Sequence, residues 1–356
     1  MSGYYFNLPQ ITELTRDQQA ALAETQKIAL SGGPGTGKSV VSLWRHIQKT
    51  INNKRTFLIT YTSTLARYLS ACARLQNSNA ALRIGKAYSC RYKLQNNHFD
   101  EIIIDEAQDL GEDLDFLKGE NYYNGFGDNI SYGADDSQIL YPEHCSTQDD
   151  LKQRFPNNIP YTLSKNFRST QRIMLFAKTC FDEAYIPREI ITGLSDNVGE
   201  KPVFMVYNNL AKQDNAIIQI IESLRGDTHN IAILVPFKRD VQTFEKLLVN
   251  SGYELHTEVS SLTEGDFSVY YEDQKRFKNG CAEIMNIHIT TFKSAKGLEF
   301  DTVIIPNFHK YSSLCGSYNV EWNDYYVACT RAKSNLYMIS NYPMPELNSV
   351  VELTIL

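Results

Sequence analysis

A glycine-rich segment near the start of the chain constrains the fold more than any other feature: Gly32-Gly33-Pro34-Gly35-Thr36-Gly37-Lys38-Ser39. An apolar run at residues 28–30 precedes it, and helical patterning at residues 39–50 follows it. This is the P-loop pattern, in which glycines let backbone amides face phosphate oxygens while the lysine neutralises the β and γ phosphates. The hydroxyl of Ser39 is expected to ligate magnesium. The alternative is a glycine-rich turn with an accidental lysine, but the flanking strand and helix favour a phosphate site.

An acidic pair supplies the second half of such a site. Residues 101–106 read Glu-Ile-Ile-Ile-Asp-Glu, so a buried strand ends in Asp105 and Glu106. Asp105 is expected beside the metal ion of the P-loop, and Glu106 is expected to polarise the attacking water. Most acidic pairs after a strand are solvated loop charges, but a pair downstream of a P-loop has a stronger claim. The two segments together predict magnesium-dependent hydrolysis of a nucleoside triphosphate.

Short apolar runs alternate with helical segments along the rest of the chain. Strands are expected at residues 56–60, 102–104, 130–134, 161–163, 231–235, 284–290 and 302–305. Buried strands separated by helices indicate parallel sheets with βαβ crossovers, and therefore an α/β fold. A length of 356 residues suggests two domains, and the prolines and asparagines at residues 156–160 interrupt both patterns. We therefore expect one domain at residues 1–156 and a second at residues 157–356.

Composition limits the partners and the compartment. The 35 Lys and Arg residues face 41 Asp and Glu residues, so the net charge is −6 and binding of nucleic acid would need a local groove. The 7 cysteines include no Cys-x-x-Cys pair, which argues against a disulfide framework or a zinc site and for a reducing cytosol. No apolar run approaches the roughly 20 residues of a membrane-spanning helix, and the first residues lack a secretory pattern. We therefore expect a cytoplasmic protein without a membrane partner.

The acidic pair opens a longer signature. Residues 105–109, Asp-Glu-Ala-Gln-Asp, resemble a motif of superfamily 1 helicases, specifically of the UvrD/Rep-like group. Residues 14–18, Leu-Thr-Arg-Asp-Gln, resemble the Q motif of that family, which implies that Gln18 reads the adenine edge. Residues 134–138, Ala-Asp-Asp-Ser-Gln, are similar to the segment whose glutamine, here Gln138, senses the γ-phosphate and couples it to DNA.

Three further motifs follow in the order of the family. Residues 163–169, Leu-Ser-Lys-Asn-Phe-Arg-Ser, resemble its Asn-Tyr-Arg-Ser motif, which implies that Phe167 stacks on the base and Arg168 reaches the γ-phosphate. Residues 290–300, Thr-Thr-Phe-Lys-Ser-Ala-Lys-Gly-Leu-Glu-Phe, are the most distinctive match and imply that Glu299 holds the ribose. Residues 326–332, Tyr-Val-Ala-Cys-Thr-Arg-Ala, resemble the final motif and make Arg331 a second arginine finger. The matches extend over nearly the whole chain.

The resemblance implies two RecA-like P-loop NTPase domains with parallel sheets, the first of which binds ATP and Mg²⁺. The P-loop and Asp105 lie in the first expected domain, whereas Arg168 and Arg331 lie in the second. A γ-phosphate can therefore attract both arginines until hydrolysis removes the attraction, so that closure and catalysis become one event. Domains that close and open on a strand in this way make a motor. We expect a helicase or translocase core that hydrolyses ATP on single-stranded DNA, with 3′-to-5′ movement implied by the family alone.

Contacts with nucleic acid are marked less sharply. Residues 61–66 stand where the family contacts single-stranded DNA, so Tyr61 and Thr62 are candidates, and Tyr141 has a similar claim because an aromatic face stacks on bases. Lys293 is a candidate for phosphate contact. The alternatives are a half-buried tyrosine at a strand end for Tyr61 and a solvated loop lysine for Lys293. RNA as the partner stays open.

Some positions depart from the pattern of the family. Glu143 stands where relatives place an aromatic residue, and the large insertions that engage and split duplex in relatives are missing or short, which predicts a minimal core with weak unaided unwinding. A second hypothesis is therefore a nucleic-acid-sensing regulatory NTPase subunit without processive unwinding. Compact UvrD-like proteins of this kind stand beside nucleases in bacterial antiviral systems such as Gabija, and a nuclease partner would be another chain. A structural protein that has lost turnover is a third hypothesis, which Glu106 and the two arginines disfavour.

Overall fold

The computed structural model describes Tyr4, Phe6, Leu94, Ile186 and residues 8–87, 97–111, 129–139, 145–181, 188–194, 196–256, 266–271, 284–316 and 320–356. The chain forms two compact units. The first unit is Phe6–Phe167, and the second is Arg168–Leu356 together with Met1–Tyr5. The chain divides later than the expected boundary between residues 156 and 157, because residues 159–162 form a strand that pairs with the first strand of the first unit.

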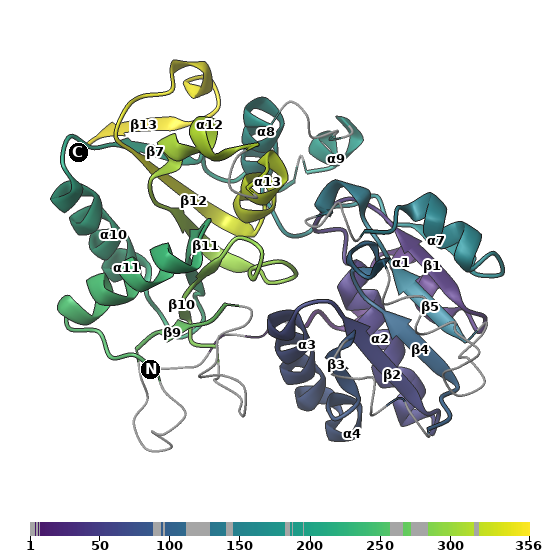
Figure 1. Cartoon of the computed structure of the whole chain (residues 1–356). Helices are drawn as coiled ribbons and strands as arrows, with labels where there is room; N and C mark the ends of the chain where they lie inside the picture. The colour runs from purple at the N-terminus through teal and green to yellow at the C-terminus, as the bar shows by residue number, and fades with distance from the viewer. Residues whose placement is uncertain are drawn as a thin grey trace. The chain divides into compact units, whose positions relative to one another are not determined.

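The first unit is built on a parallel sheet in the order β3-β2-β4-β5-β1-β6 (Figure 1). The strands are β1 (Ile28–Ser31), β2 (Thr56–Thr60), β3 (Ile84–Lys86), β4 (Glu101–Ile104), β5 (Ile130–Gly133) and β6 (Ile159–Thr162). The helices that accompany them are α1 (Arg16–Ala23), α2 (Lys38–Ile51), α3 (Ser63–Gln76), α4 (Ser78–Ala81) and α7 (Gln148–Arg154), with 3-10 turns at Ile11–Glu13, Ala107–Asp109 and Asp136–Gln138. Helix α2 packs against β2, β4 and β5. The P-loop joins the carboxyl end of β1 to the first residue of this helix.

The second unit has its own parallel sheet, in the order β13-β7-β12-β11-β8-β10-β9 among the residues that the structure describes. The strands are β7 (Val203–Val206), β8 (Ile231–Val235), β9 (Ser268–Val269), β10 (Ile287–Thr291), β11 (Phe300–Ile305), β12 (Ala332–Ser340) and β13 (Glu352–Ile355). The helices are α8 (Gln171–Cys180), α9 (Arg188–Thr192), α10 (Leu210–Leu224), α11 (Lys238–Asn250), α12 (Tyr311–Leu314) and α13 (Trp322–Cys329), with 3-10 turns at Phe308–Lys310 and Pro345–Leu347.

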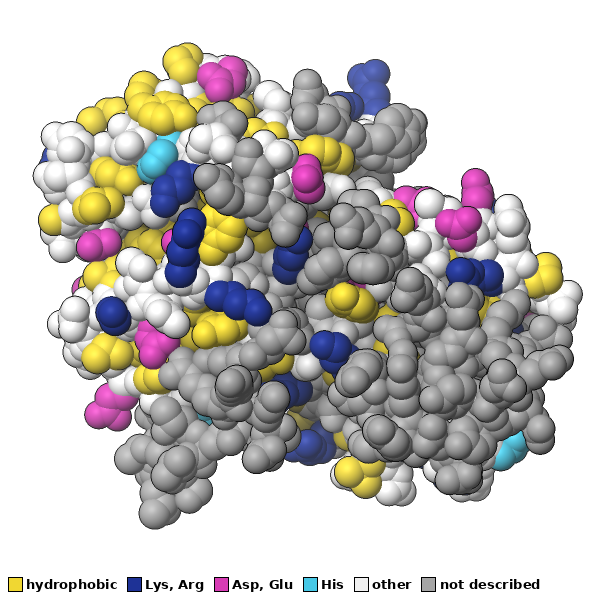
Figure 2. All heavy atoms as spheres, viewed as in Figure 1, with side chains coloured by type: hydrophobic (Ala, Val, Ile, Leu, Met, Phe, Trp, Pro, Cys, Tyr) yellow, Lys and Arg dark blue, Asp and Glu magenta, His cyan; other side chains and the backbone are white. Residues whose placement is uncertain are grey.

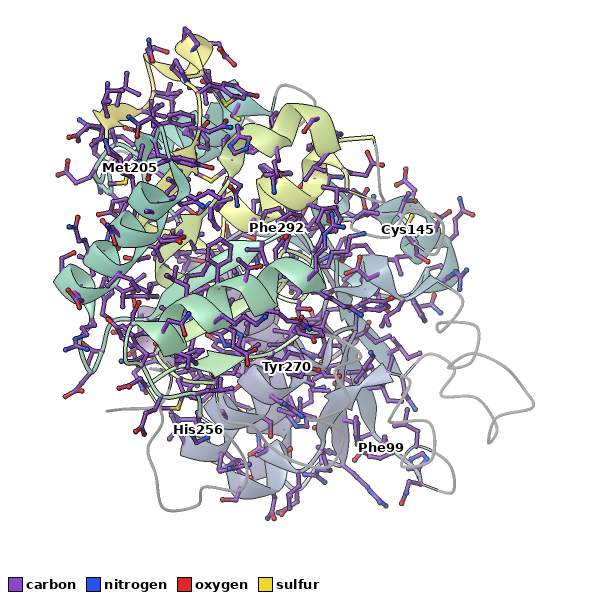
Figure 3. The ribbon with its side chains drawn as sticks, turned by 60° about the vertical axis from the view of Figure 1, so that its left-hand side comes forward. Phe99, Cys145, Met205, His256, Tyr270 and Phe292 are labelled. Carbon is purple, nitrogen blue, oxygen red and sulfur yellow. The ribbon has the colours of Figure 1, made fainter. Side chains whose placement is uncertain are left out.

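Local chemistry explains where the main helices begin. Side chains of Thr15, Thr62, Thr170 and Asn209 each accept a backbone N–H from the first turn of the helix that follows. The central strands β2, β8 and β10 are buried along their whole length, as strands covered on both faces by helices must be. The core of the second unit also contains aromatic pairs. In one of them, the ring centroid of Phe292 (Figure 3) lies 4.8 Å from that of Tyr325.

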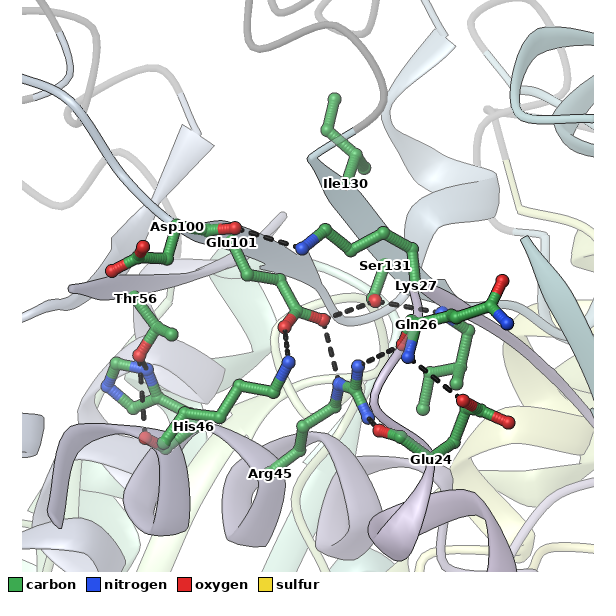
Figure 4. Close-up of polar contacts among 12 residues, drawn as sticks. Glu24, Gln26, Lys27, Arg45, His46, Thr56, Asp100, Glu101, Ile130 and Ser131 are labelled. Carbon is green, nitrogen blue, oxygen red and sulfur yellow. Dashed lines mark hydrogen bonds and ion pairs between the residues drawn. The ribbon is translucent and has the colours of Figure 1, made fainter. Parts of the chain in front are cut away.

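A buried ion network anchors the start of β4 in the first unit (Figure 4). Glu101 is fully buried, and its carboxylate accepts from Arg45 Nε at 2.7 Å, from the Lys49 ammonium and from the Ser131 hydroxyl. The guanidinium of Arg45 also donates to the carbonyls of Glu24, at 2.7 Å, and of Gln26. The network therefore ties α2, the segment after α1 and two strands together.

Tyr4 belongs to the second unit although it precedes the first in sequence. Its backbone N–H donates to the Ile284 carbonyl at 2.7 Å, and its ring packs edge to face against Phe300 at 5.8 Å. The chain therefore passes from the second unit to the first after Tyr5 and returns after Phe167. No helix among the described residues is long and apolar enough to span a bilayer.

The α/β class with two parallel sheets is confirmed. Strands at residues 56–60 and 231–235 begin and end as predicted, whereas β3, β7, β9, β12 and β13 were not predicted. After its first residue, Ala332, strand β12 continues with Lys333, Ser334 and Asn335, so its first half lacks the apolar pattern of a buried strand. Strand β13 lies at the sheet edge and is mostly exposed, which removes the same signal.

Candidate nucleotide-binding site

The loop between β1 and α2 has a backbone shape that suits glycine. The φ angle is 142° at Gly32, 72° at Gly35 and 87° at Gly37. A Cβ atom on Gly32 would collide with the Leu163 carbonyl, and one on Gly37 would collide with the Gln18 amide. Both the dihedral angles and the neighbouring atoms therefore require glycine, as a backbone that wraps closely around an anion does.

Lys38 is held at the centre of this loop. Its ammonium donates to the carbonyls of Gly32, at 2.7 Å, and Gly33, at 3.0 Å, and lies 3.4 Å from the Asp135 carboxylate. The residue is 6% exposed, so its charge sits in a site largely shielded from water. The loop thus folds around a buried ammonium group. Phosphate oxygens could replace the two carbonyls as its hydrogen-bond acceptors.

Asp135, which follows β5, is the acid that balances Lys38. Burial raises the pKa of Asp135, but the Lys38 ammonium and hydrogen bonds from Ser137 and Gln138 outweigh burial and leave that pKa below its usual value. The Gln138 amide donates to Asp135 Oδ2 at 2.5 Å, and the Ser137 hydroxyl donates to Oδ1 at 2.6 Å. Gln138, the predicted γ-phosphate sensor, is therefore connected to the P-loop lysine through one carboxylate.

The candidate metal ligands lie near Lys38 and Asp135. Asp105 follows β4 and is 1% exposed, and its N–H donates to the Ile59 carbonyl at 2.8 Å. A Cβ atom on Gly133, at the end of β5, would lie 3.6 Å from Asp105 Oδ1 and 3.7 Å from the Ser42 hydroxyl. Ser39 is half-buried in the first turn of α2. Among the described residues no group of three or more His, Cys, Asp or Glu is placed to hold a metal ion.

Glu106 has an unusual backbone and a defined partner. Its φ of 58° and ψ of 46° are left-handed values that residues other than glycine, asparagine and aspartate seldom adopt. The Gln108 side-chain amide nitrogen donates to Glu106 Oε2 at 2.5 Å, and Gln108 Oε1 accepts the N–H of Asp135 at 3.2 Å. Gln108 therefore links the predicted catalytic acid to the segment that carries Gln138.

Gln18 supports the P-loop from α1. Its amide nitrogen donates to the Thr36 carbonyl at 2.9 Å, and its amide oxygen accepts the Thr15 N–H at 2.9 Å as part of the helix cap. Thr36 in turn donates its hydroxyl to the Gly33 carbonyl at 2.8 Å. These contacts are with the loop, and recognition of adenine by Gln18 stays a prediction.

The end of the first unit also holds the loop. The Asn166 amide donates to the Pro34 carbonyl at 2.9 Å, and the N–H of Phe167 donates to the Gly35 carbonyl at 2.9 Å. The ring of Phe167 is 45% exposed, with the Lys165 ammonium 5.3 Å from its centroid. An exposed ring on a tethered backbone suits stacking on a flat ligand.

In the second unit, two predicted ligand residues contact each other. Arg168 Nε lies 3.2 Å from Glu299 Oε2, and both side chains are partly exposed. The hydroxyl of Tyr4 donates to the Glu299 carbonyl. The predicted γ-phosphate and ribose residues of this unit are thus neighbours.

Arg331 differs in setting from Arg168. It is fully buried, and its guanidinium donates to the carbonyls of Val327, at 3.0 Å, and Leu298, at 3.4 Å. Its own carbonyl accepts the N–H of Phe300 at 3.0 Å. In this structure Arg331 therefore braces the segment before β11, and its role as an arginine finger stays a prediction.

Lys293 lies near a buried acid that the sequence did not suggest. Its ammonium is 3.9 Å from Asp324, which accepts the N–H of Glu321 at 3.0 Å in the first turn of α13. Burial raises the pKa of Asp324 to about 6, although the positive charges of Lys293 and Lys296 oppose that rise.

The predicted nucleic-acid residues divide into three cases. Tyr61 is half-buried and packs against a core cluster of the first unit. Thr62 is 2% exposed and caps α3 by accepting the N–H of Leu65 at 3.1 Å. Tyr141 lies outside the described residues.

Sequence reasoning missed several residues that organise the site. Gln108 and Asp135 lie inside recognised motifs, so their position was a usable signal. Asn166 also lies in a motif, although its partner Pro34 is far away in sequence. Tyr4 carries no motif, and nothing in the sequence pointed to it.

Comparison with known proteins gives two profile matches, each just over half of the chain. The profile of the UvrD-like helicase C-terminal domain matches residues 161–278 and 266–342. The profile of the Schlafen group 3 DNA/RNA helicase domain matches residues 26–217. Together the two profiles cover both units.

The chain matches only part of the length of its individual relatives. A protein of Acanthamoeba polyphaga mimivirus, named for ATP-dependent DNA helicase activity, is 28% identical over 255 residues, which are 68% of this chain and 35% of that protein. The RecB subunit of the RecBCD enzyme of Chlamydia pneumoniae is 33% identical over 84 residues, 24% of this chain and 8% of the subunit. The structure of Mss116p bound to ssRNA and AMP-PNP shares 14% identity at a TM-score of 0.54, over 96% of this chain and 74% of that one, which shows a shared fold.

Proposed function

The chain belongs to the UvrD-like helicases of superfamily 1, and on that basis we propose that it hydrolyses ATP with Mg²⁺ and couples hydrolysis to movement along single-stranded DNA, from 3′ to 5′. The observation that carries the proposal is the connected network of Lys38, Asp135, Gln108 and Glu106. It links a phosphate-binding cation to a carboxylate that can act on water.

In this proposal the P-loop amides and Lys38 bind the β and γ phosphates, as the glycine backbone and the buried ammonium allow. Ser39 and Asp105 hold Mg²⁺, because hydroxyl and carboxylate oxygens are the ligands that this hard cation prefers. The ion, when bound, neutralises charge that develops on the phosphates. Glu106 orients and polarises the attacking water, while Gln138 reports the γ-phosphate through Asp135.

The remaining nucleotide contacts are proposed to come from Arg168, Glu299 and Arg331 of the second unit and from Phe167 and Gln18 of the first. Arg168 and Arg331 are proposed to stabilise the charge of the transferred phosphoryl group, and Glu299 is proposed to hold the ribose. Phe167 would stack on the base with Gln18 at the adenine edge. The contact of Arg168 with Glu299 supports a common role for those two residues.

Single-stranded nucleic acid is proposed to contact Tyr61, Thr62, Tyr141 and Lys293. On the face seen in Figure 2, basic, acidic and apolar side chains are mixed among the described residues, in keeping with a net charge of −6. Binding would therefore depend on few phosphate contacts and on stacking.

A regulatory NTPase subunit that acts with a nuclease is the second candidate. The net charge of −6 and the acidic Glu143 favour it, since both weaken the hold on a DNA strand. ATP hydrolysis on DNA without displacement of a labelled strand, even with enzyme in large excess, would support this candidate.

The first experiment measures the rate of ATP hydrolysis with and without single-stranded DNA. The Lys38→Ala variant is the negative control. Stimulation by DNA that disappears in the variant is the expected result. Hydrolysis that ignores both DNA and RNA would contradict the motor and leave the regulatory subunit. A comparison of Tyr61→Ala with wild type then tests the DNA contact, since the DNA concentration needed for stimulation should rise while basal hydrolysis stays the same.

A further inference from the structure

We propose that Tyr4 is a positioning residue for the nucleotide, because it fixes the backbone of Glu299 in the second unit. The inference rests on the proposed function, in which Glu299 holds the ribose. It adds a residue that lies outside every motif and outside the first unit's fold, although it precedes that unit in sequence.

Tyr4 is held through its hydroxyl and its backbone N–H. Its hydroxyl donates to the Glu299 carbonyl, and its N–H donates to the Ile284 carbonyl at 2.7 Å. The residue is 5% exposed, and its ring meets that of Phe300 edge to face, with 5.8 Å between centroids and 81° between planes. A residue held by two hydrogen bonds and a ring contact is placed in one orientation.

The segment that Tyr4 touches is otherwise held at the residues on either side of Glu299. Arg331 donates to the Leu298 carbonyl at 3.4 Å and accepts the N–H of Phe300 at 3.0 Å. Arg168 pairs with the Glu299 carboxylate at 3.2 Å. The Tyr4 hydroxyl is thus the described group that binds the Glu299 carbonyl, and its loss would let the carbonyl and the attached side chain shift.

The same stretch of chain also reaches the P-loop. Gln18, fourteen residues after Tyr4, donates to the Thr36 carbonyl within the first unit. Tyr4 and Gln18 therefore each donate to a backbone carbonyl, that of Glu299 and that of Thr36 in the P-loop. Through these two contacts the segment holds backbone positions in the P-loop and beside Glu299.

The test compares Tyr4→Phe with wild type, because phenylalanine keeps the ring contact and removes only the hydroxyl. We expect KM for ATP to rise about threefold to tenfold, the range for loss of one neutral hydrogen bond, with kcat unchanged. The KM for 2′,3′-dideoxy-ATP should hardly change, because that nucleotide lacks the hydroxyls that Glu299 would hold. The preference for ATP over the dideoxy nucleotide should therefore fall, and a purely structural role would not produce that fall.

Tyr342→Phe is the matched control. Tyr342 also lies in the second unit and donates its hydroxyl to a backbone carbonyl, that of His309, at 2.9 Å. Its removal should leave both KM values unchanged. Equal effects of the two variants would overturn the inference, since they would reflect loosening of the unit as a whole.

Glu299→Ala separates this inference from the proposed function. If Glu299→Ala abolishes the preference for ATP and Tyr4→Phe leaves it intact, Tyr4 is not a positioning residue and the ribose contact stands. If Glu299→Ala has no effect on the preference, the ribose contact itself is refuted and the inference falls with it. Parallel losses in both variants, with normal melting temperatures, would support the inference.

Discussion

Glu106 combines a demanding conformation with the central chemical task of the proposed reaction. A left-handed backbone at a residue other than glycine costs on the order of 1–2 kcal/mol. The cost is tolerated because the Gln108 amide holds the carboxylate and because the short turn Ala107–Asp109 follows directly. Strain of this kind gathers at functional sites, where surrounding contacts over-determine one geometry.

Glu106→Gln should bind ATP and hydrolyse it at least about 100-fold more slowly, the smallest effect expected for removal of a general base. Glutamine keeps an oxygen that can accept the Gln108 amide, so the local structure should persist. Steady-state hydrolysis and equilibrium binding of a fluorescent ATP analogue would measure the two effects. Normal turnover in the variant would remove Glu106 from its assigned role.

For single residues, the sequence named as candidates those that lie in short continuous motifs. Lys38, Asp105, Glu106 and Gln138 were all named as candidates, whereas the contact of both Lys38 and Gln138 with the Asp135 carboxylate was not. The support from Asn166 to the Pro34 carbonyl was not predictable, because it joins segments 132 residues apart. Arg331 was named for a catalytic role, but a pattern cannot show that a guanidinium is buried on carbonyls of its own unit.

Among the elements, β4 and α2 are joined by the Glu101 network. Desolvation raises the pKa of Glu101, but Arg45 and Lys49 outweigh it and hold that pKa below its usual value. The ionised pair therefore contributes stability above the unfolded-state pKa of about 4.5, and this contribution is lost as the pH falls below it.

Glu101→Ala should destabilise the first unit by about 3–5 kcal/mol at neutral pH, because Arg45 would stay buried without its counter-charge. Lys49→Met is the control: its side chain is 23% exposed, and Arg45 still pairs with Glu101 in that variant. Urea denaturation followed by circular dichroism measures both. Equal losses in the two variants would contradict a dominant role for the Arg45 pair.

Helix α13 carries the opposite case, a buried acid whose folded-state pKa is raised from 3.8 to about 6. The folded protein therefore binds the Asp324 proton more tightly than the unfolded chain does. The stability from this group is fully present below pH 3.8 and is lost as the pH rises through 6. Lys293, Lys296 and Glu321 are the charged groups that act on it.

Asp324→Asn should therefore be more stable than wild type at pH 8, by up to about 3 kcal/mol, and the gain should shrink toward pH 5. Asparagine can still accept the Glu321 N–H, so the helix cap is kept. Denaturation curves at pH 5, 6.5 and 8 test the trend, with Asp149→Asn on the exposed face of α7 as the control. A gain that does not vary with pH would contradict it.

Strands were predictable from sequence where an unbroken run of apolar residues marks them. Strands β2 and β8 are buried at every position, and their boundaries were found from sequence. Strand β6 was expected only at residues 161–163, because Pro160 disfavours a strand, yet an edge position accommodates it. Strands β3 and β13, short or exposed, gain their order from pairing with a neighbour and not from their own composition.

For the molecule as a whole, each unit has its own sheet and core, so each has its own source of stability. We expect heat to unfold the protein in two transitions. A non-hydrolysable ATP analogue with Mg²⁺ at about 100 times its Kd should stabilise what it binds by about 2.7 kcal/mol.

Both transitions should move upward if residues of both units contact the nucleotide, as proposed. Differential scanning calorimetry of wild type and of Lys38→Ala, which should show no shift, measures this. A shift confined to one transition would mean that Arg168, Glu299 and Arg331 do not contribute to nucleotide binding.

The contact between Tyr4 and Glu299 joins residues 295 positions apart. A ribosome that adds about 5–20 residues per second needs roughly 15–60 s to travel that distance. The strands of the first unit emerge within that interval and can pair while the rest is still being made, whereas Tyr4 must wait for β10, β11 and the residues between them. During translation, the Tyr4 hydroxyl therefore stays without its Glu299 partner until that later part of the chain has been made.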